Sequence, residues 1–185
     1  MPLTASAMLE LGTIAPDFAL TDVVTGKTVH RDDFCGQKAL LVLFICAHCP
    51  YVQHIERSLG KLGTDYAGKS LGIVAISSND ASEYPADGSA GMKRQARDNG
   101  FVFPYLYDES QAVAHAYKAA CTPDIFLFDG DFRLVYRGQY DESRPSIGIP
   151  VTGKDLRTAI DLALAGKPVP ADQRPSIGCN IKWKV

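Results

Sequence analysis

The sequence predicts an α/β protein of one domain, with a mixed and partly parallel sheet. Apolar runs of strand length alternate with stretches of helix length, an order typical of βαβ units. Two apolar segments around Asp129-Gly130-Asp131 add an antiparallel hairpin. The 185 residues are 46% hydrophobic and 22% charged, which suits one hydrophobic core and argues against a disordered or fibrous chain.

Hydrophobic spacing and turn residues predict each element in chain order. The expected elements of the first half are short strands over 17–20 and 27–30 around Thr25-Gly26, a buried strand over the apolar run 38–45, a helix over 52–66 where apolar residues recur every three or four positions, and a buried strand over 71–77. Those of the second half are a helix over 92–99 closed by Gly100, an extended aromatic segment over 101–107, a helix over 108–120, hairpin strands over 125–128 and 132–137, and a helix over 153–164. We expect a single domain over 1–185, with a core of about 12–165 after a loose lead-in and a Pro-rich tail, 166–185, docked on it.

Charge is balanced along the chain. Lys and Arg number 19 and Asp and Glu 21, for a net charge of −2 without blocks of like charge. The basic footprint of nucleic-acid binding and a polybasic membrane patch are therefore missing. No apolar run approaches the roughly 20 residues that span a bilayer, and residues 1–18 have no basic residue and no continuous apolar core, unlike a signal peptide. We expect a cytoplasmic protein without nucleic-acid or membrane partners.

The cysteine content is the first unusual feature. The chain has five cysteines, at Cys35, Cys46, Cys49, Cys121 and Cys179. An odd number in a chain expected to remain in a reducing compartment does not predict a disulfide scaffold. Closely spaced thiols then indicate redox chemistry or metal binding. Cys35 lies in a polar turn, where we expect a passive thiol.

The segment Cys46-Ala47-His48-Cys49 lies where a buried strand ends and a helix begins. The helix N-terminus favours a thiolate, and His48 can lower a thiol pKa further. We expect Cys46, ahead of the helix, to be exposed and to be the nucleophile, with a pKa below that of a free thiol. Cys49, about one turn inside the helix, is then the resolving thiol. At a strand-to-helix junction this spacing is typical of thioredoxin-like proteins.

Three motifs resemble those of the thioredoxin superfamily, in the branch shared by AhpC/TSA peroxiredoxin-like and TlpA/ResA-like proteins. They are Ala15-Pro16-Asp17-Phe18-Ala19-Leu20, Phe44-Ile45-Cys46-Ala47-His48-Cys49-Pro50 and Thr122-Pro123-Asp124. More narrowly, CAHCPYVQHIE, ACTPDIFLFD and PSIGCNIKWK resemble an uncharacterised bacterial group of thioredoxin-family proteins with a CxHCP site. The resemblance implies a thioredoxin fold with an N-terminal β-hairpin and an inserted βα unit between the cysteine pair and a cis-proline.

The resemblance also implies a function and a site. The implied function is a thiol–disulfide oxidoreductase that exchanges a Cys46–Cys49 dithiol or disulfide with protein or small-molecule disulfides and needs no cofactor. Its implied partners are a disulfide-containing protein substrate and a recycling reductase. Pro123 is implied to be cis, to face the cysteine pair and to keep metals from it, while Thr122 pairs its backbone with a bound substrate chain. Ala47, His48 and Pro50 are the supporting residues within the turn, and Pro50 suits a first helical turn.

This chain departs from the superfamily pattern at two positions near the pair. Ile45 stands where thioredoxins usually carry a tryptophan, and Leu40 stands where they carry a buried carboxylate. Asp80 and Glu83, just past the strand 71–77, are candidates to replace that acid.

Two alternative functions remain open. One is a peroxiredoxin-like, peroxide-scavenging antioxidant enzyme. The proline and threonine that such enzymes carry seven and three residues before their cysteine are Ala39 and Leu43 for Cys46. The other is a copper- or zinc-binding module that uses Cys46, Cys49 and His54.

Cys121 and Cys179 are possible additional thiols. Cys121 precedes Pro123 by two residues, so it should lie near the pair if Pro123 faces the pair. Cys179 lies in a tail that we expect to be too short for an element of its own, although Ile177, Ile181 and Trp183 can dock it. Either thiol can act in a redox relay or be buried as a small hydrophobic side chain, and free cysteines are most often buried.

Overall fold

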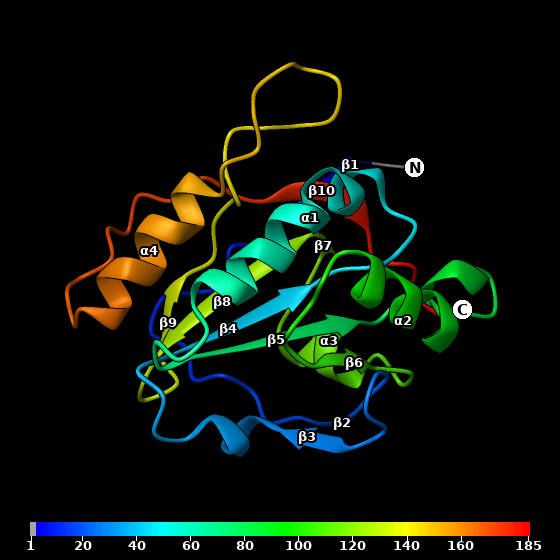
Figure 1. Ribbon diagram of the computed structural model, residues 1–185, viewed down its shortest axis with the longest axis horizontal. Coiled ribbons are helices and arrows are strands. Elements are labelled where there is room, and N and C mark those ends of the chain that lie inside the picture. Colours follow the sequence, from blue (N-terminus) through cyan, green and yellow to red (C-terminus); the bar gives the residue numbers. More distant parts are fainter. Residues whose placement is uncertain (1–2) are drawn as a thin grey trace.

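The computed structural model describes residues 3–185 and contains a seven-stranded mixed sheet beside a three-stranded sheet (Figure 1). The strands are β1 (Leu3–Ala5), β2 (Ala19–Asp22), β3 (Thr28–His30), β4 (Ala39–Phe44), β5 (Leu71–Ser77), β6 (Tyr105–Tyr107), β7 (Cys121–Thr122), β8 (Asp124–Asp129), β9 (Leu134–Tyr136) and β10 (Ile177–Asn180). The α-helices are α1 (Pro50–Asp65), α2 (Ser89–Asp98), α3 (Ala112–Ala116) and α4 (Lys154–Leu164), and short 3-10 helices lie at Arg31–Phe34 and Pro85–Asp87. Within 3–185, none of the helices combines the length and the apolar character needed to cross a membrane.

The larger sheet has the order β3-β2-β6-β5-β4-β8-β9. β4 pairs in parallel with β5 and antiparallel with β8, and Val42 stands opposite both Val74 and Phe126. All six residues of β4 are buried, as a continuous apolar run predicts for a strand covered on both faces. The predicted mixed sheet is confirmed, and β4 is its buried centre.

Helices cover both faces of this sheet (Figure 1). Leu41 and Leu43 of β4 share a hydrophobic core with residues of α1, α2 and α4, including Leu59 of α1. Leu40 and Val42 face a second core, which includes residues of α3. Successive strand residues point to opposite faces, so β4 contributes to both cores. The end of β4 is thereby held firmly where it meets α1.

Most predicted elements are present, and three are shorter than expected, one of them the hairpin strand predicted over 132–137, which is confined to β9. The predicted strand 71–77 is β5, but the helix predicted over 108–120 is confined to α3. Left-handed backbone at Gln111 (φ 65°) and Lys118 (φ 51°) interrupts the helical conformation on both sides of α3. The aromatic segment 101–107 forms a strand only over β6.

The two chain ends differ most from the prediction. The expected lead-in contains β1, and the expected tail contains β10, which lies between β1 and β7 in the smaller sheet. Leu3 pairs with Cys179, and Cys179 pairs with Thr122. Trp183 stacks on His115 with ring centroids 4.2 Å apart. The tail is therefore an integral strand; Met1 and Pro2, at the start of the predicted lead-in, lie outside the described residues.

Candidate active site

The two cysteines of the CxxC segment lie in the turn that connects β4 to α1. Cys49 is the N-cap residue of α1 and Pro50 is its first helical residue, where a missing N–H costs little. Both Cys46 and Cys49 are 0% exposed, whereas Ala47 and His48 between them are half-buried. The expectation that Cys46 is exposed is therefore wrong, because Thr122 of β7 and the buried Asp87 contact the turn and cover it.

Strand β7 covers the turn from one side. The Sγ atom of Cys46 lies 3.5 Å from Oγ1 of Thr122, and the Sγ atom of Cys49 lies 3.2 Å from the carbonyl oxygen of Thr122. The Thr122–Pro123 peptide bond is cis. Thr122 is thus a common neighbour of both thiols, and the sequence motif around Pro123 is brought to the CxxC turn.

Strand β10 adds a third thiol to the pair. The Sγ atoms of Cys179 and Cys49 lie 2.8 Å apart, and all five cysteines are free thiols. Because Cys179 is paired with Thr122 across the two strands, the chain's own β10 occupies the backbone edge that the resemblance assigns to a substrate chain. The candidate site therefore contains three thiols instead of two.

Cys121 lies beside this group without joining it. It is buried, and its Sγ atom lies 3.6 Å from the carbonyl oxygen of Pro123 and 4.0 Å from that of Ser176. Burial raises the pKa of Cys121 far above that of a free thiol. Among the two additional thiols that the sequence singles out, only Cys179 contacts the pair.

Among the Cys46, Cys49 and Cys179 thiols, Cys49 is the one whose negatively charged thiolate form is favoured. The hydrogen bond from the Cys46 thiol lowers the pKa of Cys49 against the effect of burial, and the neighbouring Cys179 thiol lowers it further. The pKa of Cys46 is raised by this same hydrogen bond, by burial and by the nearby Asp87 carboxylate. The direction of the pKa shift expected for Cys46 is thus favoured at Cys49 instead, whose sulfur has the Cys46 and Cys179 thiols as neighbours.

A buried carboxylate that the sequence analysis missed holds the turn in place. Asp87 is 0% exposed and accepts hydrogen bonds from the backbone N–H groups of Ala47 and His48 at 2.8 and 3.0 Å. It also accepts one from Asn79 Nδ2 at 2.8 Å and pairs with His48 Nδ1, which lies 3.9 Å from Cys46 Sγ. Asp87 thus fixes the backbone and the histidine of the turn.

The proposed replacements for the missing carboxylate do not reach the pair. Asp80 accepts a hydrogen bond from the Ser82 hydroxyl at 2.6 Å, and Glu83 is exposed. Asp87 lies in a polar segment without periodicity, so no local pattern marks it. The one usable signal is that its segment follows β5, whose carboxyl end shares a sheet edge with that of the parallel strand β4.

The predicted metal ligands do not form a set. His54 Nε2 lies 3.0 Å from Ser143 Oγ, and His54 belongs to no cluster of potential ligands with Cys46 and Cys49. Within 3–185, the one cluster with metal-ligand spacing is Cys46, His48 and Asp87, whose ligand atoms lie within 4.8 Å of one another. Both Asp87 oxygens already accept hydrogen bonds, and structural zinc sites need four ligands. The cluster therefore fits a positioned histidine better than a metal site.

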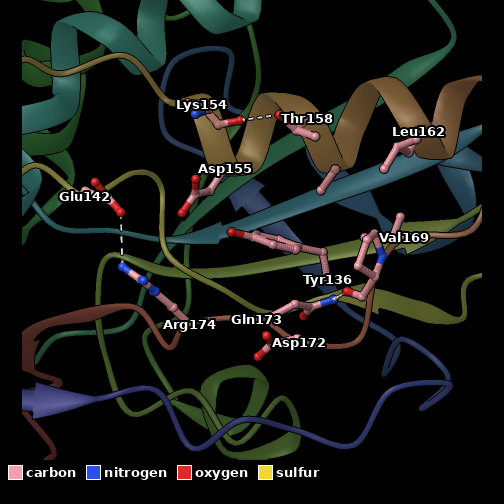
Figure 2. Close-up of a pocket in the computed structure, with 12 residues that line it drawn as sticks. Tyr136, Glu142, Lys154, Asp155, Thr158, Leu162, Val169, Asp172, Gln173 and Arg174 are labelled. Carbon is pink, nitrogen blue, oxygen red and sulfur yellow. Dashed lines mark hydrogen bonds and ion pairs between the residues drawn. The ribbon is translucent and has the colours of Figure 1, made fainter.

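Two of the hollows within residues 3–185 lie outside the cluster of the Cys46, Cys49 and Cys179 thiols. A crevice of about 20 Å³ beside Pro123 is lined by Tyr51, His54 and Ile177, among others. A larger pocket of about 350 Å³ lies between α4 and the segment 169–174 (Figure 2). It contains none of the residues that the sequence analysis singles out, so the site remains the buried thiols.

Comparisons with known proteins agree along most of the chain. Residues 11–137 match the model of the AhpC/TSA family. A crystal structure of an uncharacterized conserved protein from Geobacillus kaustophilus is 53% identical with a TM-score of 0.97, over 100% of this chain and 97% of that chain. Thiol-disulfide oxidoreductase ResA of Geobacillus kaustophilus (strain HTA426) is 24% identical over 143 residues, or 73% of this chain and 74% of that protein. The thioredoxin domain of a thiol-disulfide oxidoreductase from Bacteroides vulgatus has 23% identity and a TM-score of 0.60, over 74% of this chain and 90% of that chain.

Proposed function

The chain belongs to the AhpC/TSA family and has the thioredoxin fold, as its motifs predicted, and on this premise we propose that it exchanges a Cys46–Cys49 dithiol for the disulfides of substrate proteins. Its relatives include thiol-disulfide oxidoreductases, so at the level of the family it is an oxidoreductase. The observation that carries the finer proposal is the place of both thiols in the turn at the start of α1, where Cys49 is the N-cap residue and Thr122 contacts both. Such a place stabilises thiolates, which are the nucleophiles of disulfide exchange.

The proposed reaction moves two electrons from the chain to the substrate. Cys46 attacks one sulfur of the substrate disulfide while its proton passes to the Cys49 thiolate, to which it is already hydrogen-bonded. A Cys46–substrate disulfide forms, and the first substrate thiolate leaves. Cys49 then loses its proton and attacks Cys46 Sγ, and the second substrate thiolate leaves and is protonated. The products are a reduced substrate and a Cys46–Cys49 disulfide.

His48 and Asp87 act in this proposal as positioning residues. Asp87 holds the N–H groups of Ala47 and His48, and the His48 ring stacks on Tyr84 with centroids 5.0 Å apart. These contacts keep the turn between the two cysteines in one conformation. A fixed turn lowers the entropic cost of bringing Cys46 and Cys49 together in the disulfide.

The expected partners follow from this reaction. A protein with an accessible disulfide is the substrate, a thiol reductase in the cytoplasm recycles the chain, and no organic cofactor takes part. The peroxidase alternative finds less support, because the positions that activate peroxide in peroxiredoxins are Ala39 and Leu43. Both side chains are buried within β4 and offer no polar group to a peroxide.

Catalysed reduction of insulin disulfides by dithiothreitol tests the proposal. Wild-type chain should accelerate the reaction, Cys49→Ser should reduce the rate to that of dithiothreitol alone, and Cys46→Ser should reduce it well below that of the wild type. Cys35→Ser is the matched control, because Cys35 is an exposed free thiol, and it should keep the wild-type rate. Full activity of both Cys46→Ser and Cys49→Ser would contradict the proposal, and peroxide consumption by the wild type would favour the peroxidase instead.

A further inference from the structure

Cys179 occupies a place in the fold that brings it to the redox pair. Its Sγ atom lies 2.8 Å from Cys49 Sγ, although 130 residues separate them in sequence. Cys49 therefore has two thiol neighbours, Cys46 in its own turn and Cys179 from β10. A disulfide requires that two sulfurs approach each other within bonding reach, and the second pair already meets this condition with little movement.

The position of Cys179 is built into the structure and is not that of a loose end. Strand β10 is paired on one side with β1 and on the other with β7. Beyond the strand, the backbone N–H of Lys182 donates to Asn79 Oδ1 at 2.8 Å, and its carbonyl accepts from Asp80 at 2.9 Å. Contacts on both sides of Cys179 thus hold its thiol against Cys49.

We propose that Cys179 is a third redox-active thiol, which receives the disulfide from Cys46 by forming a Cys49–Cys179 bridge. This inference rests on the proposed Cys46–Cys49 chemistry and extends it. The Cys179 thiolate attacks Cys49 Sγ in the Cys46–Cys49 disulfide, and Cys46 leaves as a thiolate that takes up the proton released by Cys179. One disulfide is broken and one is formed, so the step needs no oxidant or reductant.

The exchange also determines where the recycling thiol attacks. Cys179 is the less deeply buried residue of the two, with 4% of its surface exposed in the reduced chain against 0% for Cys49. A thiolate of the reductant attacks Cys179, and Cys49 leaves as the thiolate that its surroundings favour. A second thiol of the reductant then attacks the reductant's sulfur in the mixed disulfide and releases Cys179. The reductant ends as a disulfide, and the chain returns to its dithiol state with Cys46 reduced throughout this half of the cycle.

Treatment of the Cys46→Ser variant with oxidised glutathione tests the new bridge directly. Glutathione should first attach to Cys49, and Cys179 should then displace it. Alkylation and peptide mapping by mass spectrometry under non-reducing conditions should find a Cys49–Cys179 bridge and no glutathione on Cys49. In Cys46→Ser/Cys179→Ser the glutathione should remain on Cys49, and Cys179→Ala in place of Cys179→Ser should give the same result.

The matched control is Cys46→Ser/Cys121→Ser. Cys121 is buried like Cys179 but its sulfur contacts only carbonyl oxygens, so this variant should still form the Cys49–Cys179 bridge. Persistent glutathione on Cys49 in folded Cys46→Ser, or a bridge to Cys121, would overturn the inference. The Cys179→Ser variant separates the two claims: a Cys46–Cys49 bridge there upholds the proposed function even if the relay fails, whereas no bridge to Cys49 in any variant contradicts both.

Discussion

Cys49 combines two structural roles that together explain its charge. It is the N-cap residue of α1, and its sulfur is the common neighbour of the Cys46 and Cys179 thiols. Unpaired N–H groups at a helix start and donated hydrogen bonds both stabilise an anion. We therefore expect the thiolate of the reduced chain on Cys49, and Cys46 becomes a thiolate when its own proton passes to Cys49.

We predict that Cys49 is the cysteine that ionises first. In a pH titration of ultraviolet thiolate absorbance, the reduced wild type should retain a thiolate at pH values below roughly 8.5, the pKa of a free cysteine. Cys49→Ser should remove this low-pH thiolate, and Cys35→Ser should leave it unchanged. Cys46→Ala should raise the pKa of Cys49 because the strongest donor is lost. A thiolate that survives Cys49→Ser and disappears in Cys46→Ala would show that Cys46 holds the charge.

Asp87 should control the ionisation of Cys46. Its carboxylate raises the pKa of Cys46, after the effects of Cys49 and of burial. Asp87→Asn keeps an oxygen that can accept the N–H groups of the turn but removes the charge. In a Cys49→Ser background, where Cys46 titrates without its partner, Asp87→Asn should lower the pKa of Cys46 in the same absorbance titration. Glu83→Gln, which removes an exposed charge from the same loop, is the control; equal effects of the two variants would refute the assignment.

At the scale of elements, the sequence predicts an element that depends on its own residues and misses one that depends on pairing with distant residues. Strand β5 was predicted with its observed bounds because a continuous apolar run identifies a strand buried on both faces. Helix α1 was predicted from its apolar spacing, and Pro50 explains its earlier start. Strands β1, β7 and β10 have two to four residues each and form only by pairing with one another, which no local pattern contains. The third thiol of the site was left open for this reason.

Gly178 should be essential to the placement of β10. A Cβ atom at this position would lie 1.9 Å from the carbonyl oxygen of Thr122, and backbone cannot yield as a flexible side chain can. Gly178→Ala should therefore push β10 away from β7 and lower the free energy of unfolding by about 1–3 kcal/mol. Urea unfolding measures this loss. In the Cys46→Ser background, peptide mapping should show that the Cys49–Cys179 bridge no longer forms.

Gly148→Ala is the control, because it strains the backbone at a site where it does not displace β10. Gly148 has a φ of +75°, which L residues rarely adopt, but no atom lies within 4 Å of an added Cβ. The variant should lose stability while the Cys49–Cys179 bridge still forms in the Cys46→Ser background. If Gly178→Ala also retained this bridge, the close approach of β10 to Thr122 would not be what positions Cys179.

At the scale of the whole molecule, burial near the site should make stability depend on pH. Asp124 follows Pro123 at the start of β8, and burial raises its pKa from an ordinary 3.8 to about 6, although the Ala120 N–H donates to it at 3.0 Å. Above pH 3.8 the unfolded chain ionises this group while the folded chain resists ionisation up to about 6. The contribution of Asp124 to the free energy of unfolding is therefore fully present well below pH 3.8. It is lost as the pH rises through the pKa of Asp124 in the folded chain, and the total loss is about 3 kcal/mol.

Asp124→Asn should remove this dependence. Urea unfolding at pH 4 and pH 7 should show that the wild type loses about 2.4 kcal/mol relative to the variant as the pH rises. Asp131→Asn, which changes an exposed carboxylate in the neighbouring turn, should leave the pH dependence of the wild type unaltered. A stability difference between wild type and Asp124→Asn that is the same at both pH values would contradict the raised pKa.

More of the overall architecture than of the chemistry of the site could be predicted from the sequence. The order of apolar runs predicted the mixed sheet, and the CxxC segment and the Thr122-Pro123 motif predicted two of the segments that meet. Burial of Cys46, the charge on Cys49 and the support from Asp87 arise from contacts between distant segments. The role of Asp87 and the charge on Cys49 therefore followed only from the three-dimensional arrangement, not from the spacing of neighbouring residues.

A redox titration in mixtures of reduced and oxidised glutathione tests the central claim most directly. After equilibration and rapid alkylation, the wild type should lose two alkylatable thiols together in one two-electron transition. Peptide mapping should place Cys49 in every bridge, with Cys46 or Cys179 as its partner, and should find Cys35 and Cys121 outside any bridge. A chain that keeps all of its thiols in oxidised glutathione, or that gains only single glutathione adducts on exposed Cys35, would contradict a thiol–disulfide function.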